Sequence, residues 1–152
     1  MSFTLFYGGL LVVVGSLTWL SRYHVYQKME LLLIAAWATT NTAAHISFVT
    51  NAVVAPTSDA LVALCIGILG YRARSEVARI IVVLYVFVLE SWVIAYVYHA
   101  QLSRALYDII GVLFLTQLLV LGGASARMAI RVRNVSGGER LRSGPSRSKV
   151  AR

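Results

Sequence analysis

The sequence predicts an all-α membrane protein, a polytopic bundle of about five transmembrane helices. Three observations support this prediction: the composition, the length of the apolar runs and the one-sided placement of basic residues. Hydrophobic residues make up 59% of the 152 residues and charged residues 13%, and the mean hydropathy is +0.75. Soluble domains carry about 25% charged residues. A water-soluble fold of this length could not bury so much apolar surface, which excludes a soluble enzyme or a disordered chain.

Four apolar runs are long enough to cross a bilayer, which takes roughly 17–25 residues as a helix. They are residues 3–20, 30–49, 80–100 and 105–126. Helices are expected because an isolated strand leaves its backbone polar groups unsatisfied in lipid. The first run lacks a basic segment before it and a small-residue cleavage site after it, so we interpret it as a membrane span.

A third apolar run, residues 60–71, is shorter than the others. As a helix it reaches only about 18 Å at 1.5 Å per residue. Residues 56–59 (PTSD) before it form a helix-start signal, with a turn, a capping hydroxyl and an acid near the positive end of the helix dipole. Extended to residues 59–73, the helix would bring Arg72 and Arg74 to the interface by snorkelling. The alternative is a half-helix buried among the other four.

The basic residues favour the five-span prediction. With five crossings, all but one of the 14 Lys and Arg residues fall on one side, and Arg104 alone lies on the other. The side rich in positive charge holds the first and third connections and the segment after the last span, with Arg22, Lys28, Arg72, Arg74, Arg79, Arg127, Arg131 and Arg133 among its basic residues. Because cytoplasmic loops carry such an excess, we expect the amino terminus outside, the carboxyl terminus inside, and a location in a cytoplasmic-type (inner) membrane.

The chain divides into a transmembrane domain, residues 1–126, and a basic tail, residues 127–152. The tail is rich in Ser, Gly and Arg and is predicted to be flexible and cytoplasmic. A basic tail can bind nucleic acid, but directly after a membrane span contact with anionic lipid is the favoured interpretation.

Glu90 is the most unusual residue of the predicted spans, because it follows ten apolar or aromatic residues near the middle of the fourth span. A carboxylate there should be protonated, paired or in contact with water. Asn41 and Gln117 lie at a similar depth, roughly 17–20 Å along their helices from the membrane boundary. His45 is four residues after Asn41 and shares its helix face. We therefore predict a polar intramembrane layer of these four residues, which either lines an ion path or joins helices by hydrogen bonds.

Two histidines and two pairs of small residues suggest further roles. His45 and His99 lie on different spans and could ligate a b-type haem, but no binding motif accompanies them and the haem interpretation is disfavoured. No metal-ligand spacing and no catalytic motif is present, so neither a cofactor nor an enzyme activity is expected. The pairs of small residues have the spacing that allows close helix packing, and they are Ala63 with Gly67 and Gly122 with Ala126.

These features favour a small protein that acts by oligomerisation, as a holin-like or channel-like pore with a polar path. The alternatives are a structural or accessory subunit of a larger membrane complex or virus-type membrane, and a haem-carrying membrane subunit. The expected partners are the lipid bilayer and either further copies of the chain or another membrane protein.

Overall fold

The computed structural model describes the backbone of residues 2–46, 48–98 and 103–142, and side chains within residues 6–134. This part of the chain is all-helical, as predicted, with five helices and no strand. The helices are α1 (Ser2–Leu20), α2 (His24–Ile46), α3 (Phe48–Ala73), α4 (Glu76–Tyr98) and α5 (Ser103–Arg142).

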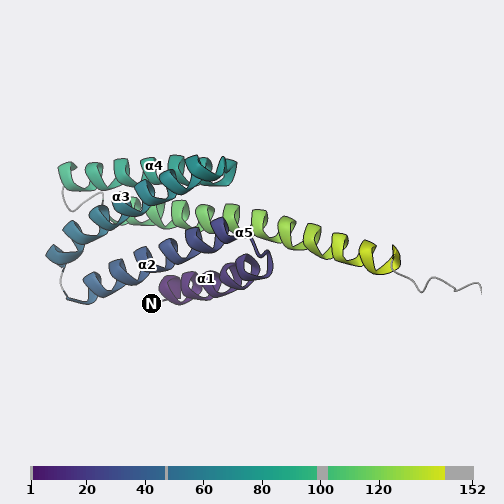
Figure 1. Cartoon of the computed structure of the whole chain (residues 1–152). Helices are drawn as coiled ribbons and strands as arrows, with labels where there is room; N and C mark the ends of the chain where they lie inside the picture. Colours follow the sequence, from purple (N-terminus) through teal and green to yellow (C-terminus); the bar gives the residue numbers. More distant parts are fainter. Residues whose placement is uncertain (1, 47, 99–102, 143–152) are drawn as a thin grey trace, which may run out of the picture.

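The five helices alternate in direction and form one bundle (Figure 1). Each helix contacts the next along the chain, and α1 also packs against α5, so the helices close into a ring. The α1–α2 and α3–α4 connections and the long end of α5 therefore lie at the same end of the bundle (Figure 1). We call this the basic end, because it carries the arginines of both connections and those that follow the apolar part of α5.

Both connections at the basic end use an arginine in the left-handed conformation. Arg22 has a φ of 53° and Arg74 a φ of 49°. After α3, the amide of Arg74 donates to the carbonyl of Tyr71 and the amide of Ser75 to that of Gly70, which is the Schellman arrangement that ends a helix. Glycine usually occupies this position, so the chain places a positive charge where the backbone alone would favour glycine.

Buried residues recur three and four positions apart along each helix, the spacing of side chains that pack between nearly antiparallel helices. In α4 this buried stripe comprises Ala78, Ile81, Tyr85, Val88, Ser91 and Trp92. Large apolar residues also cover the outside of the bundle, as expected for a surface in contact with lipid tails. Examples from the five helices are Val12, Leu31, Leu61, Val93 and Leu119.

Three helices are long and apolar enough to span a membrane, and their apolar segments are Val53–Ala73, Glu76–Tyr98 and Asp108–Asn134. The third helix was predicted to begin at residue 59, and this prediction is wrong. Helix α3 begins at Phe48, and Pro56 lies inside it. Proline lacks the amide hydrogen that an interior helical position donates, so it resembles a start signal even where the helix continues. Residues 51–58, which lie between the expected second and third spans, are helical.

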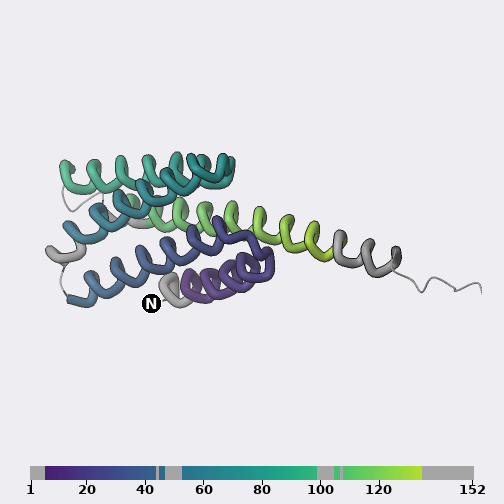
Figure 2. The backbone as a smooth tube through the Cα atoms, viewed as in Figure 1, coloured from purple at the N-terminus to yellow at the C-terminus, as the bar shows by residue number. Residues whose placement is uncertain are grey.

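The first apolar helix is shorter, with Phe6–Leu20 as its described apolar part. Helix α2 ends at Ile46, before the expected limit at residue 49. Helix α5 is longer than expected, because residues 127–142, predicted as part of a flexible tail, continue it. Figure 2 shows the helix running on without a break through residues 127–134. Alanine, methionine and arginine at positions 126–131 are good helix formers, and no proline interrupts them. Residues 143–152 lie outside the described part of the chain.

Candidate functional site

Two carboxylic acids lie inside the bundle, and neither belongs to the predicted polar intramembrane layer. Glu30 on α2 and Asp59 on α3 are each only 1% exposed. In sequence, Glu30 is the first residue of an apolar run and Asp59 resembles a helix cap. Both lie on the buried stripes of their helices, Glu30 beside Met29 and Asp59 between Ala55 and Val62.

Asp59 is held by one hydrogen bond from a neighbouring helix. The indole Nε1 of Trp92 on α4 donates to its Oδ2 atom over 2.9 Å. The Oδ1 atom is buried and has no hydrogen-bond partner among the described residues. Because indole has one donor, Trp92 can supply one bond to this carboxyl group and no more.

Glu30 lies against the middle of α1. A Cβ atom added at Gly15 would come within 3.6 Å of its Oε1 atom, so the glycine leaves room for the carboxyl group. Thr18, one turn further along α1, donates its hydroxyl to the Gly15 carbonyl over 2.8 Å. Neither oxygen of Glu30 has a hydrogen-bond partner within the described part of the chain.

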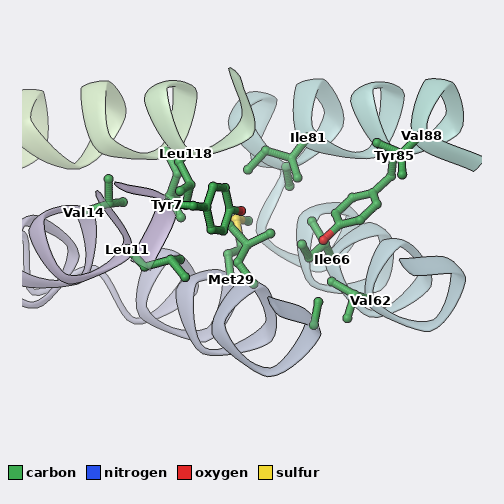
Figure 3. Packing of buried hydrophobic residues seen from close by; sticks show 14 of the residues in the cluster. Tyr7, Leu11, Val14, Met29, Val62, Ile66, Ile81, Tyr85, Val88 and Leu118 are labelled. Atoms are coloured by element: carbon green, nitrogen blue, oxygen red, sulfur yellow. The ribbon is translucent and has the colours of Figure 1, made fainter. Parts of the chain in front are cut away.

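Two tyrosines are also buried in the interior, Tyr7 of α1 at 4% exposed and Tyr85 of α4 at 0% exposed. The hydroxyl of Tyr85 has no hydrogen-bond partner among the described residues. The two phenol rings point from opposite sides into the interior of the bundle (Figure 3). Phe114 of α5 makes an edge contact with each ring, at centroid distances of 6.2 Å to Tyr7 and 6.0 Å to Tyr85.

The predicted polar layer is not assembled within one chain. Gln117 is fully buried, and its side-chain amide has no hydrogen-bond partner among the described residues. Asn41 is half-buried and donates to the carbonyl of Trp37 in its own helix over 2.8 Å. Glu90 and His45 are exposed on the outside of the bundle. The expected interior partners of Glu90 are therefore absent from the part of the chain that the structure describes.

The described residues provide no geometric support for haem binding. His45 faces outward near the end of α2, and His99 lies outside the described residues. Within the described ranges, no three His, Cys, Asp or Glu side chains form a group that could hold a metal ion.

Three of the four predicted packing residues lie at helix contacts. A Cβ atom added at Gly122 of α5 would lie 3.1 Å from Val14 of α1, and one added at Gly67 of α3 would lie 3.7 Å from Val82 of α4. Ala63 packs against the core and Ala126 is half-buried.

Among the described glycines, the tightest surroundings are at Gly70, which was not one of the predicted packing residues. A Cβ atom at this position would collide with Ala78, so the glycine permits the tight α3–α4 connection. The spacing of small residues could have indicated it, because Gly67 and Gly70 are three residues apart on one helix.

The basic residues assigned to lipid contact and topology are exposed, and all belong to the basic end. They are Arg72, Arg74, Arg79, Arg127, Arg131 and Arg133. Arg79 pairs with Glu76 on the surface over 2.9 Å. An exposed pair of this kind leaves the positive charge of this end largely intact.

No protein family, curated protein or solved structure matches this chain.

Proposed function

We propose that this protein crosses a membrane with all five helices, its basic end in the cytoplasm, and that it acts as an oligomeric pore of the holin-like or channel-like kind. In this proposal the polar path runs between copies of the chain. Its lining includes Glu90 and the outward polar face of α2, on which Thr39, Thr42 and His45 are exposed.

The exposure of Glu90 carries this proposal. The side chain projects from the outer face of α4, about 21 Å along the helix from Glu76 at 1.5 Å per residue. Its neighbours on that face are large exposed apolar residues, Phe87 and Val93 among them. A carboxyl group that faces lipid tails at this depth is costly, and the cost falls when a second protein surface covers it or water reaches it. A small bundle encloses little water, so a path between several copies meets both conditions.

The arrangement of charge supports the orientation. Both connections at one end and the extended end of α5 carry arginines, and alternating helix directions bring them together (Figure 1). Positive loops are retained in the cytoplasm during insertion. The same end would lie against anionic lipid headgroups, which attract juxtamembrane basic residues.

The test uses the full chain in liposomes loaded with a self-quenched dye, together with native mass spectrometry in detergent. We expect wild-type protein to release dye and to appear as an oligomer. Glu90→Leu should abolish release, because it removes the polar group from the path. Glu76→Gln, an acid-to-amide change in the exposed first turn of the same helix, is the control and should leave release unchanged.

An oligomer that releases no dye, or unchanged release in Glu90→Leu, contradicts the proposed pore. A second type of protein that remains bound in fixed ratio through purification from its native membrane would instead indicate the accessory subunit.

A further inference from the structure

A hollow at the basic end lies between helices α3 and α4, close to their connection. Its volume is about 790 Å³. Three arginines line it, Arg72 and Arg74 from the end of α3 and the connection, and Arg79 from the first turn of α4, and none of its lining residues is acidic. Arg79 pairs with Glu76, whereas Arg72 and Arg74 form no ion pair within the described part of the chain. The hollow is therefore lined by positive charge that is largely uncompensated.

An apolar groove continues from this hollow along α3 and α4. Its volume is about 470 Å³, and four residues line both spaces: Gly67, Tyr71, Arg72 and Val82. The groove extends from Arg72 to Ala63, about 14 Å along α3 at 1.5 Å per residue. This length is close to the depth of one leaflet, because the hydrocarbon core of a bilayer is about 30 Å thick.

A glycine of α3 leaves the space for the groove. A Cβ atom added at Gly67 would lie 3.7 Å from Val82 of α4, in ordinary contact, so the rest of a larger side chain would have to occupy the groove. Exposed apolar side chains form its walls, and they are Leu64, Ile68 and Val86. The groove therefore offers an apolar surface to a hydrocarbon chain and no polar group along most of its length.

The positive hollow and the apolar groove together select an amphipathic anion. Arginine binds phosphate through paired, charge-assisted hydrogen bonds, and the positive end of the α4 dipole lies at the same place. Tyr71 is 87% exposed and lines both spaces, and tyrosine is typical of the level of the headgroups. A phosphate group at the arginines would leave an acyl chain of the same molecule in the groove, at the depth of the same leaflet.

A second copy of the chain fits this surface less well. Ala63 and Gly67 have the spacing of small residues at helix interfaces in membranes. Copies that are inserted in the same orientation, however, have their basic ends at the same level. The arginines of one copy would then face those of the next, and such contacts between like charges are unfavourable. The charges therefore favour a phospholipid over a second copy.

We propose that the hollow and the groove form a binding site for one anionic phospholipid, which we call the lipid site. The phosphate lies at Arg72, Arg74 and Arg79, and one acyl chain lies beside Gly67. The proposal rests on the membrane-crossing part of the proposed function and is independent of the pore. A lipid in this position contacts both α3 and α4, so it joins the two helices at the leaflet of the basic end.

Native mass spectrometry of the full-length, delipidated protein in detergent tests the proposal. The protein is titrated with phosphatidylglycerol or with phosphatidylcholine of the same acyl chains. We expect one phosphatidylglycerol per chain to bind more tightly than phosphatidylcholine. Arg72→Gln should weaken phosphatidylglycerol binding about fivefold, the effect of one basic residue next to anionic lipid. Arg131→Gln, at an exposed arginine of α5 outside the lipid site, is the matched control and should leave binding nearly unchanged.

A second variant tests the groove while all three arginines remain. Gly67→Leu places a side chain where the acyl chain lies, so it should weaken phosphatidylglycerol binding at least as much as Arg72→Gln does. Gly123→Leu is its control, because an added Cβ atom at Gly123 meets nothing within 4 Å. Circular dichroism checks that Gly67→Leu is folded. The Arg72→Gln measurement changes an exposed side chain and does not depend on packing.

Equal binding of the two lipids, or equal losses in Arg72→Gln and Arg131→Gln, would overturn the lipid site. Complete displacement of phosphatidylglycerol by inorganic phosphate would also overturn it, because a site for free phosphate needs no groove. Loss of the oligomer in Gly67→Leu with unchanged lipid binding would show that a second copy occupies the groove. Dye release is measured separately, so a protein that prefers phosphatidylglycerol but releases no dye contradicts only the pore.

Discussion

The inside of this bundle and its outward face each carry acidic residues at membrane depth, and the two regions treat them differently. Asp59 lies in the interior, covered by protein and bonded to Trp92. Glu90 lies on the outward face among apolar residues. Apolar residues on either side of an acid in the sequence indicate that it lies deep in a membrane span. They do not show whether it faces the interior or the outside, which depends on the helix face it occupies. Residues three and four apart share a face, and Glu90 falls between the buried positions Val88 and Trp92.

The largest effect on stability is expected at two adjacent glycines of α5, one facing the interior and one facing outward. Gly122 is buried against Val14, whereas an added Cβ atom at Gly123 meets nothing within 4 Å. We expect Gly122→Leu to lower the free energy of unfolding by about 3 kcal/mol or more, because overpacking forces α1 and α5 apart. Gly123→Leu should leave stability nearly unchanged. Thermal unfolding in detergent, followed by circular dichroism, measures both variants, and equal losses would contradict the assigned faces.

An intermediate effect is expected at the indole that bonds Asp59. Trp92→Phe removes the donor from the carboxyl group and leaves both oxygens without a hydrogen bond from the described chain. The loss should be about 1–3 kcal/mol, the range for leaving a buried polar group unsatisfied. Trp19→Phe is the control, because Trp19 is 63% exposed on the outer surface. Chemical unfolding in mixed micelles compares the two variants. A Trp19→Phe loss as large as that of Trp92→Phe would show that the hydrogen bond to Asp59 is unimportant.

The smallest effect is expected for an acid at the water boundary. Glu76 pairs with Arg79 on the surface at the start of α4, with both side chains well exposed. Glu76→Gln should change stability by only about 0.2–0.5 kcal/mol, because water and salt screen such pairs. The same unfolding assay at low and high salt measures it. A larger loss that persists in high salt would show that this acid is not freely solvated.

The sequence was sufficient for the all-helical class and for the apolar character of its long helices, because both follow from composition and run length. The positions of the buried acids could not be predicted in the same way. In a soluble helix, polar residues mark the outer face. Here the outer and inner faces are both apolar, so the sequence around Asp59 does not show which face of α3 it occupies. Pro56, directly before the Thr57-Ser58-Asp59 sequence, added a misleading start signal within α3.

Glu30 illustrates a second limit. It is the first residue of an apolar run, and such a position normally places a charge at the interface. Its burial depends on α1 passing close to α2, where Gly15 leaves space for the carboxyl group. That contact joins residues of two helices, and no pattern within either helix reveals it. Gly122, which the structure places against Val14, differs in this respect, because small residues four apart are a pattern within one helix and can be seen in the sequence.

The 40 residues of α5 extend about 60 Å at 1.5 Å per residue, roughly twice the thickness of a bilayer's hydrocarbon core. In the proposed topology this helix is too long to lie within the hydrocarbon core, so its basic half continues past the core on the proposed cytoplasmic side. Arg127, Arg131 and Arg133 are then presented at the headgroups by a continuous helix and not by a loose tail.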